Sequence, residues 1–230
     1  FLPPYEPRQV LDPDEPVTIG AMVGPEAFAE VRYLAHAKQM QALDLIPQVA
    51  EEFRQVFNRD SGGLIKPYRL EDAETIVIAL GSVLGTIKDT VDELRDAGVK
   101  IGVLGITSFR PFPISAIRDA TAHAKRIVVI EKCFAVGIGG IVSRDVRSAV
   151  RNRPQPVLTV VAGLGGRAIT KASLTKLLND AIADKLELLT FLDLDWDIVN
   201  RVLEREKKQR RSGPIAENIL RDLGPSAAGA

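Results

Sequence analysis

The sequence contains a single cysteine, Cys133, and only two histidines among its 230 residues. One cysteine excludes an internal disulfide, and it cannot supply the several thiolates that hold an iron–sulfur cluster. Neither His36 nor His123 has an acidic residue at a spacing that suggests a proton relay or a second metal ligand, so both are interpreted as helix-surface or interface residues. We therefore expect this chain to bind no metal ion and no redox cluster by itself.

Net charge and long apolar runs are also missing. Thirty basic and thirty acidic side chains cancel, which gives no reason to expect nucleic acid or an anionic membrane as a partner. No apolar run approaches the roughly 20 residues of a membrane span, and no signal peptide opens the chain. These absences predict a cytoplasmic protein that binds neither nucleic acid nor membrane. The first residue is not Met, which suggests a fragment or a processed product.

What the sequence does contain is an alternation of short apolar runs and amphipathic stretches. With 46% hydrophobic residues, the chain is able to bury a core. Four runs have the composition of strands buried on both faces, namely residues 76–80, 101–106, 127–130 and 157–161. Helical patterns follow them at residues 87–97, 114–124, 141–150 and 173–186. This order predicts an α/β fold with a doubly wound, mostly parallel sheet.

The two ends of the chain differ from this alternating part. Five prolines within residues 1–24 predict an extended arm. A helix is expected to begin at Pro25 and to be divided by Pro47 into two pieces. Near the other end, Trp196 precedes a basic run that resembles a solvated helix end or tail, residues 205–211. The expected divisions are an arm and helical segment (1–63), an α/β domain (64–187) and a C-terminal helical extension or tail (188–230).

The first candidate binding site is a glycine turn after the first expected strand, formed by Gly81, Ser82, Gly85 and Thr86. Glycine permits a positive φ, serine and threonine are favoured at helix N-termini, and the N–H groups there attract anions. The pattern lacks the third glycine of a dinucleotide motif and the lysine of a P-loop. A capped strand-to-helix turn is therefore preferred over an anion site.

The second candidate is the turn containing Gly165, Gly166 and Arg167, expected at the carboxyl end of a strand, where open α/β sheets bind ligands. Arg167 could clamp a carboxylate or a phosphate, or it could pair with an acid across an interdomain contact. Arg110, between Phe109 and two prolines, allows the same two interpretations. For Arg167 the interdomain contact is preferred.

Three further features have structural interpretations that are preferred over functional ones. The glycine run at residues 137–140 is expected to open a helix that packs closely on the sheet. Cys133 is interpreted as a small apolar core residue. The acids Glu71, Asp72 and Glu74 could raise one another's pKa and mark proton transfer, but a solvated approach to a strand is commoner. No catalytic residue and no metal ligand is assigned.

Several motifs occur in order along the chain: Phe1-Leu-Pro-Pro-Tyr-Glu-Pro, Leu11-Asp-Pro-Asp, Glu71-Asp-Ala-Glu74, Gly81-Ser-Val-Leu-Gly-Thr86, Val91-Asp-Glu-Leu-Arg95, Phe109-Arg-Pro-Phe-Pro113 and Gly163-Leu-Gly-Gly-Arg167. Together they resemble the pyruvate:ferredoxin oxidoreductase family. More closely, they are similar to the latter half of its α subunit, including the domain that resembles the C-terminal domain of transketolases. The resemblance runs from Phe1 to about Ala183.

This resemblance implies a complex that oxidatively decarboxylates a 2-oxoacid, expected to be pyruvate, to an acyl-coenzyme A. Thiamine diphosphate, Mg²⁺ and iron–sulfur clusters would lie on other domains or subunits, and electrons would pass to ferredoxin or flavodoxin. This chain would then bind none of these cofactors alone and would be inactive in isolation. Its implied role is assembly with the thiamine diphosphate-binding and ferredoxin-like parts. The alternative is a free-standing α/β enzyme or ligand-binding module that uses the turns at Gly81–Thr86 and Gly163–Arg167.

Overall fold

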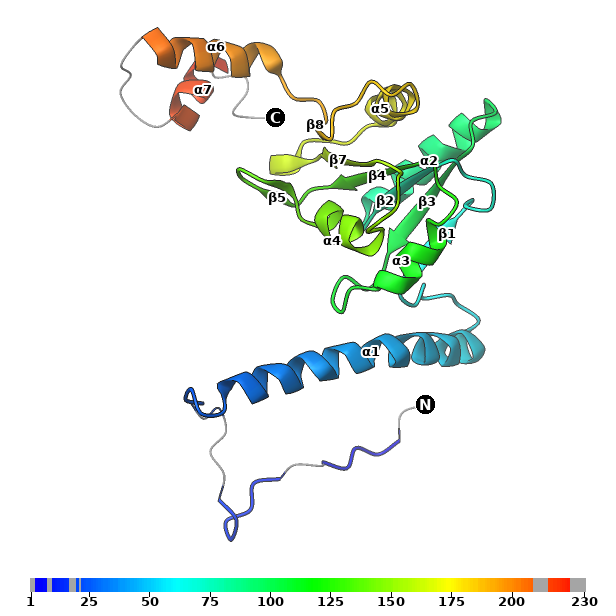
Figure 1. Ribbon diagram of the computed structural model, residues 1–230, viewed down its shortest axis with the longest axis vertical. Coiled ribbons are helices and arrows are strands. Elements are labelled where there is room, and N and C mark those ends of the chain that lie inside the picture. The colour runs from blue at the N-terminus through cyan, green and yellow to red at the C-terminus, as the bar shows by residue number, and fades with distance from the viewer. Residues whose placement is uncertain (1–2, 8–9, 17–19, 21, 209–214, 224–230) are drawn as a thin grey trace.

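The computed structural model describes the chain except for residues 1–2, 8–9, 17–19, 21, 209–214 and 224–230. A sheet with helices on both faces forms the centre of the molecule (Figure 1). A long N-terminal helix lies on one side of this α/β layer structure, and two short C-terminal helices lie on the other. The described parts of residues 3–24 contain no helix or strand, as expected for a proline-rich arm.

The central sheet has six strands: β1 (Ile65–Tyr68), β2 (Thr75–Ala79), β3 (Ile101–Ile106), β4 (Arg126–Glu131), β7 (Val157–Val161) and β8 (Leu189–Phe191). Their order across the sheet is β1-β3-β2-β4-β7-β8. The edge strand β1 pairs with β3 in antiparallel orientation, and every other pairing is parallel. The predicted fold, α/β with a mostly parallel and doubly wound sheet, is confirmed.

Side chains that alternate along the strands build two cores, one on each face of the sheet. Helices α2 (Val83–Asp96) and α5 (Lys171–Ile182) cover the face that includes Val77. Helices α3 (Ile114–Ala120) and α4 (Val142–Ala149) cover the face that includes Ile76. Because β2, β3 and β7 are buried at every position, they appear in the sequence as continuous apolar runs.

The four predicted strands are confirmed, but the two edge strands were missed. β1 contains Lys66 and Pro67, and proline is tolerated only at the edge of a sheet, so its sequence is not typical of a buried strand. β8 has three half-buried residues, too few for a periodicity to be recognised. It lies beyond residue 187, where the α/β domain is expected to end, and it pairs with β7.

The prediction of two helical pieces before the sheet is wrong. Residues Phe28–Phe57 form one helix, α1, with Pro47 inside it, and Figure 1 shows it as one continuous rod. Proline removes one helical N–H and displaces the carbonyl four residues earlier. Since that carbonyl belongs to an exposed helix, water is available to solvate it, and the helix continues through the proline.

Two glycine-containing segments differ from the predictions. Helix α2 begins at Val83 rather than at residue 87, so Gly85 and Thr86 lie inside its first turn instead of before it. The glycine run at residues 137–140 directly precedes helix α4 (Val142–Ala149), as expected, but it is not itself part of the helical turn. It closes a small hairpin between β5 (Phe134–Ala135) and β6 (Gly139–Gly140), in which Gly137 and Gly139 have positive φ.

The C-terminal part forms two helices, α6 (Trp196–Lys208) and α7 (Ile215–Leu223). Arg205 is not simply solvated, because it is only about a quarter exposed and forms an ion pair with Asp222 of α7. The rest of the predicted basic tail, residues 209–211, lies outside the described residues. Within the described ranges, no helix combines the length and the hydrophobicity that crossing a bilayer requires.

Candidate functional site

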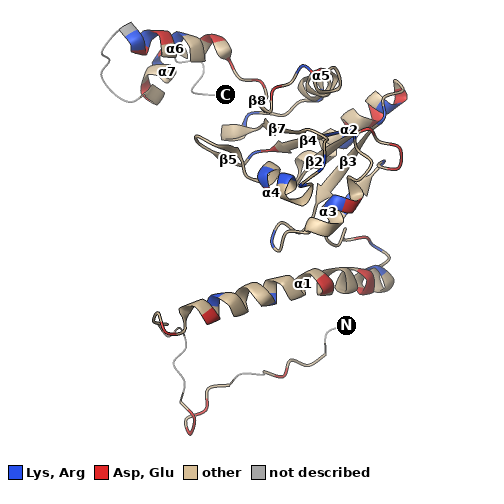
Figure 2. Cartoon of the chain, in the orientation of Figure 1, with Lys and Arg blue, Asp and Glu red and all other residues tan. Residues whose placement is uncertain are grey.

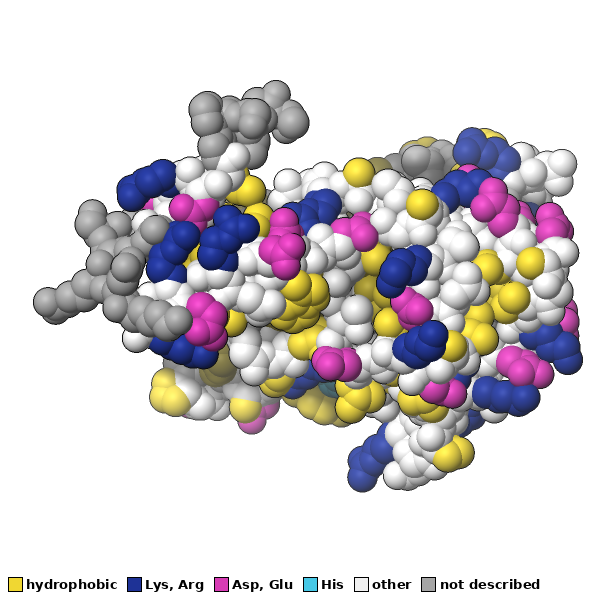
Figure 3. Space-filling view, turned by 90° about the horizontal axis from the view of Figure 1, so that it is seen from above, with side chains coloured by type: hydrophobic (Ala, Val, Ile, Leu, Met, Phe, Trp, Pro, Cys, Tyr) yellow, Lys and Arg dark blue, Asp and Glu magenta, His cyan; other side chains and the backbone are white. Residues whose placement is uncertain are grey.

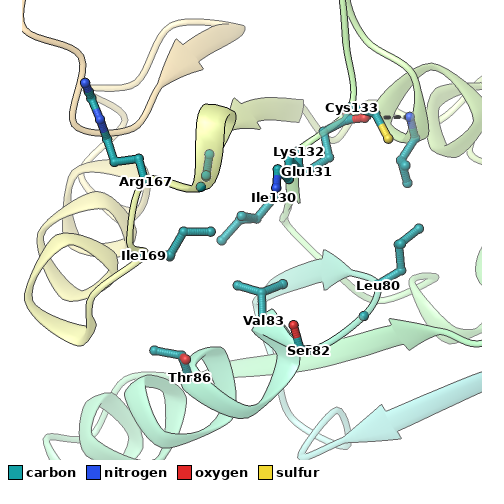
Figure 4. A pocket seen from close by; sticks show the side chains of 15 residues that line it. Leu80, Ser82, Val83, Thr86, Ile130, Glu131, Lys132, Cys133, Arg167 and Ile169 are labelled. Atoms are coloured by element: carbon teal, nitrogen blue, oxygen red, sulfur yellow. Dashed lines mark hydrogen bonds between the residues drawn. The ribbon is translucent and has the colours of Figure 1, made fainter. Parts of the chain in front are cut away.

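A pocket of about 500 Å³ opens at the carboxyl ends of β2, β4 and β7. β2 and β4 are neighbours in the sheet, but the chain passes from β2 to β3 on one side before it crosses to β4 on the other. Their carboxyl ends therefore form the topological switch point at which doubly wound sheets bind ligands. The volume lies within the range of small-molecule sites, which makes this pocket, shown in Figure 4, the candidate site.

Both glycine turns predicted from the sequence line this pocket. Gly81 follows β2 with φ +84°, and Gly163 follows β7 with φ +76°, just before the short 3-10 turn η1 (Leu164–Gly166). An L side chain is strained at such angles, so glycine sets the direction in which each turn leaves its strand. Of the predicted site residues, five contribute to the lining: Gly81, Ser82, Thr86, Gly166 and Arg167.

The remaining three predicted residues lie elsewhere. Gly85 and Gly165 belong to the same turns but are not among the described residues that line the pocket. Arg110 is on another surface, where it donates to the Asp145 carboxylate over 2.8 Å and lies 4.1 Å from the centre of the Phe109 ring. Arg110 therefore has structural partners on the α3–α4 face.

Ser82 occupies the N-cap position of α2 without capping it. Its backbone is helical, with φ −66° and ψ −24°, and its side chain accepts no hydrogen bond from the first turn. Thr170, by contrast, is extended and its hydroxyl accepts from the Ser173 N–H at 3.1 Å. The prediction of a capped turn at Ser82 is therefore wrong, and Figure 4 shows the serine hydroxyl among the pocket side chains.

Arg167 lines the pocket but directs its charge out of it. Figure 4 shows the side chain pointing away from Ser82 and Thr86. Its guanidinium donates to the main-chain carbonyl of Asp193, in the segment between β8 and α6. The arginine therefore contacts a carbonyl oxygen in this chain's own C-terminal segment. It neither clamps an anion in the pocket nor pairs with an acidic side chain, which were the two predicted interpretations.

Glu131 is the residue of this site that sequence reasoning missed. It ends β4, is only 5% exposed, and lines the pocket. Its carboxylate accepts three backbone N–H groups at the start of α4, from Ile141 (2.8 Å), Val142 (2.7 Å) and Ser143 (3.0 Å). A carboxylate is the group that a helix N-terminus favours. Glu131 therefore fixes α4 to the carboxyl end of β4 and is the tertiary cap of that helix.

Gly140 makes this arrangement possible. A Cβ atom at residue 140 would lie 2.0 Å from an oxygen of Glu131 and 2.6 Å from the Ser143 hydroxyl oxygen, far inside van der Waals contact. The signal that could have identified the cap is a glutamate at the end of an apolar run, followed by Gly-Gly immediately before a helical pattern. Only the fold brings residues 131 and 141–143 together.

Cys133 also differs from its prediction. It is exposed rather than buried in the core, because it lies beyond the end of β4 at the mouth of the pocket. Lys132, beside it, follows β4 directly and also lines the pocket. The remaining lining is largely apolar, with Leu80, Val83, Ile130 and Ile169 surrounding the space in Figure 4.

The acid cluster before β2 lies at the opposite, amino end of the strands from the pocket. A hydrogen bond from Arg95 lowers the pKa of Asp72, and one from Lys125 lowers the pKa of Glu74. Neither carboxyl therefore has the raised pKa that would have indicated proton transfer. The described residues contain no group of three or more His, Cys, Asp or Glu side chains placed to hold a metal ion.

The pocket's chemistry is that of a small apolar cleft with few free polar groups. Glu131 is fully engaged by backbone N–H groups, and Arg167 is engaged by Asp193. Among the described lining residues, Ser82, Thr86, Lys132 and Cys133 remain as polar side chains at the rim. No nucleophile paired with a base is found among these lining residues, so the geometry supports ligand contact and packing rather than a covalent reaction.

Comparison with known proteins identifies the family. Residues 73–174 match the model of pyruvate:ferredoxin oxidoreductase core domain II. Pyruvate synthase subunit PorA of Methanosarcina barkeri is 42% identical over 183 residues, which cover 78% of this chain and 46% of that protein. Ketoisovalerate oxidoreductase subunit VorA of Pyrococcus horikoshii is 34% identical over 173 residues, 74% of this chain and 44% of that protein. The chain spans about half the length of the curated relatives it matches.

A solved 2-oxoglutarate:ferredoxin oxidoreductase from Magnetococcus marinus aligns with 57% of this chain and 21% of its own, at 19% identity and a TM-score of 0.42. That score is too low to support a residue-level comparison. The family model covers β2 to the first turn of α5, including the pocket, and the PorA and VorA alignments extend over most of the chain. This chain therefore belongs to the pyruvate:ferredoxin oxidoreductase family, with core domain II at residues 73–174.

Proposed function

We propose that this chain is a structural part of a 2-oxoacid:ferredoxin oxidoreductase, and that pyruvate is the 2-oxoacid. The observation that carries the proposal is the 42% identity with a pyruvate synthase subunit over 78% of the chain. In this role the chain corresponds to the latter half of the α subunit and holds neighbouring domains in register. Catalysis would take place in the cytoplasm, at cofactors bound by the other parts of the complex.

The residues of this chain do not fit the iron–sulfur clusters or the Mg²⁺ ion of such a complex. Iron–sulfur clusters need several cysteine thiolates, and the sequence has one. The described carboxylates and imidazoles do not converge on a site for Mg²⁺, the ion that would accompany thiamine diphosphate. Mg²⁺ and the clusters would therefore be held by the thiamine diphosphate-binding and ferredoxin-like parts of the complex. We place thiamine diphosphate and coenzyme A on those parts as well, with ferredoxin or flavodoxin taking the electrons.

Purification of the native protein under anaerobic conditions tests this proposal. The expected result is a brown complex that contains this chain and reduces ferredoxin when pyruvate and coenzyme A are added. Because one relative is named for ketoisovalerate, the assay should compare pyruvate, 2-oxoisovalerate and 2-oxoglutarate. A colourless preparation of this chain without partners, or turnover by the chain alone, would contradict the proposal.

A second candidate function is ligand binding by this chain alone. It is favoured by the convergence of the Gly81–Thr86 and Gly163–Arg167 turns on one pocket of about 500 Å³ at the switch point. Calorimetric titration of the isolated chain with thiamine diphosphate, coenzyme A and nicotinamide nucleotides separates the two candidates. Micromolar binding of any of these would support a ligand-binding module, whereas the assembly role predicts no measurable heat of binding.

A further inference from the structure

A second hollow, of about 460 Å³, lies along helix α4, and its volume is within the range of small-molecule sites. We call it the α4 groove. None of its lining residues belongs to the switch-point pocket. The residues that line it are Ile141, Arg144, Asp145, Arg147 and Ser148. Two arginines three residues apart are neighbours on a helix surface, so the α4 groove brings two guanidinium groups to one place.

Arg147 is held in a fixed position by the sheet. Its Nη2 atom donates to the Val157 carbonyl oxygen over 2.8 Å and to the Thr159 hydroxyl oxygen over 2.7 Å. These bonds use both hydrogens of Nη2, and the three N–H groups on Nε and Nη1 have no acceptor among the described residues. Buried nitrogen atoms without a partner occur at Arg126 and Gln155 but not at Arg147. The free donors of Arg147 are therefore oriented and open to the surface.

The groove has more positive than negative charge. Within the described part of the chain, neither Arg144 nor Arg147 forms an ion pair with an acidic residue. Partial burial lowers the pKa of Arg147, and the attraction of Glu131 opposes this only as the weaker cause. Asp145, the acid of the groove, is paired with Arg110 over 2.8 Å. Three arginines against one aspartate leave an excess of two positive charges.

Several arginines elsewhere on the domain have acidic partners. Over the face seen in Figure 3, Lys and Arg side chains are interspersed with Asp and Glu. Figure 2, by contrast, shows basic residues on the visible side of α4. The arginine–carboxylate pairs on other elements of the domain include Arg69 with Asp92, Arg95 with Asp72 and Arg126 with Asp184. The α4 groove is thus a place where the chain leaves positive charge without balancing it.

We propose that the α4 groove binds a phosphate dianion through Arg144 and Arg147, either as free phosphate or as the phosphate monoester of a small organic molecule. A phosphate monoester carries nearly two negative charges at neutral pH and has three acceptor oxygens. Guanidinium groups donate to such oxygens in pairs. The ligand therefore matches both the excess charge and the two donor groups, whereas a single carboxylate would neutralise only one arginine.

The groove has room for more than the phosphate. Its volume of about 460 Å³ accommodates an organic part as well, and Ile141, which is 39% exposed, offers that part an apolar contact. Ser148 donates its hydroxyl to the Arg144 carbonyl oxygen over 3.1 Å and is thereby engaged within the helix. We therefore expect an ester to bind more tightly than free phosphate. This inference goes beyond the proposed assembly role and does not depend on it.

Calorimetric titration of the full 230-residue chain with adenosine monophosphate, inorganic phosphate and adenosine tests the proposal. Adenosine monophosphate is the probe for a phosphate monoester, and adenosine is the same molecule without the phosphate. The monophosphate should bind with a dissociation constant on the order of 1 mM or below. Inorganic phosphate should bind more weakly, and adenosine should give no saturable heat. Salt at about 0.5 M should weaken binding of both anions, because it screens exposed charges.

Two matched variants locate the site. Arg144→Gln should weaken binding of the monophosphate by about tenfold or more, because it removes a charge-assisted donor, and the exposed position should leave folding intact. Arg151→Gln removes the same charge from an exposed arginine that does not line the groove, and should change the affinity by less than about twofold. Binding at the switch-point pocket is told apart in the same way, because Arg144 does not line that pocket.

Three results would overturn the proposal. Absence of saturable binding by both anions up to about 20 mM would show that the groove is not a phosphate site. Equal weakening by Arg144→Gln and Arg151→Gln would mean that the anion is attracted only by general surface charge. Adenosine binding as tightly as its monophosphate would mean that the phosphate is not what the chain recognises.

Discussion

The sheet domain and helix α1 use the same kinds of side chain in opposite surroundings. Strands β2 and β3 bury every residue between the two helical layers, whereas α1, with an apolar stripe of its own, buries none. The strands could be recognised from their continuous apolar runs, and α1 from the helical spacing of its apolar residues. The comparison teaches that a local sequence pattern specifies an element, while burial depends on whether the rest of the molecule provides a partner.

The largest expected difference concerns how the helices of the two regions begin. Glu131→Ala removes the acceptor for three backbone N–H groups at the start of α4, two of them in buried hydrogen bonds, and should lower the free energy of unfolding by about 3–5 kcal/mol. Glu30→Ala, in the exposed first turn of α1, should cost about 0.5 kcal/mol. Urea unfolding of both variants measures the difference, and equal losses would show that Glu131 is not a structural cap.

The next comparison uses the same substitution in both regions. Val128→Ala creates a cavity at a position with no exposure in β4 and should cost about 2–3 kcal/mol. Val49→Ala, at a position 51% exposed in α1, should change stability by less than about 0.5 kcal/mol. Chemical denaturation at one low protein concentration keeps any association of α1 out of the measurement. A cost at Val49 similar to that at Val128 would mean that α1 packs within the monomer.

The smallest expected effects distinguish two glycines at the pocket turn. Gly81→Ala places a side chain at φ +84°, although nothing lies within 4 Å of the new Cβ, so the expected loss of about 1–2 kcal/mol is backbone strain. Gly85→Ala, in the helical first turn of α2 with equally open space, should stabilise the protein by about 1 kcal/mol. Thermal unfolding should therefore shift in opposite directions, and a shift of the same sign in both variants would contradict the assigned backbone.

The elements that the sequence predicted correctly are those whose signal is local. The continuous apolar runs of β2, β3, β4 and β7 identified strands buried on both faces, and the turn at Gly81 has the positive φ expected of glycine. The edge strands β1 and β8 were missed because they are short and partly polar. The uninterrupted α1 was missed because the rule that proline breaks a helix is weaker for a helix exposed to water.

The candidate site could be predicted only in part. Gly81, Ser82, Thr86, Gly166 and Arg167 were chosen as members of two separate turns, and the sequence does not show that the two turns share one pocket. Arg167 was chosen for its charge, but its orientation is set by the Asp193 carbonyl, 26 residues later. Glu131 was missed because a glutamate at the end of a strand, taken alone, is commonly a solvated residue.

The sequence by itself determined the class of fold, the buried strands and the family, because each depends on residues near one another in the chain or on motifs in a fixed order. The tertiary structure decided which strand ends meet, that a carboxylate from β4 caps α4, and that no residue of α1 is buried. These features arise from contacts between segments distant in sequence. Their geometry is fixed by the packing of helices on both faces of the sheet, which no local pattern of residues specifies.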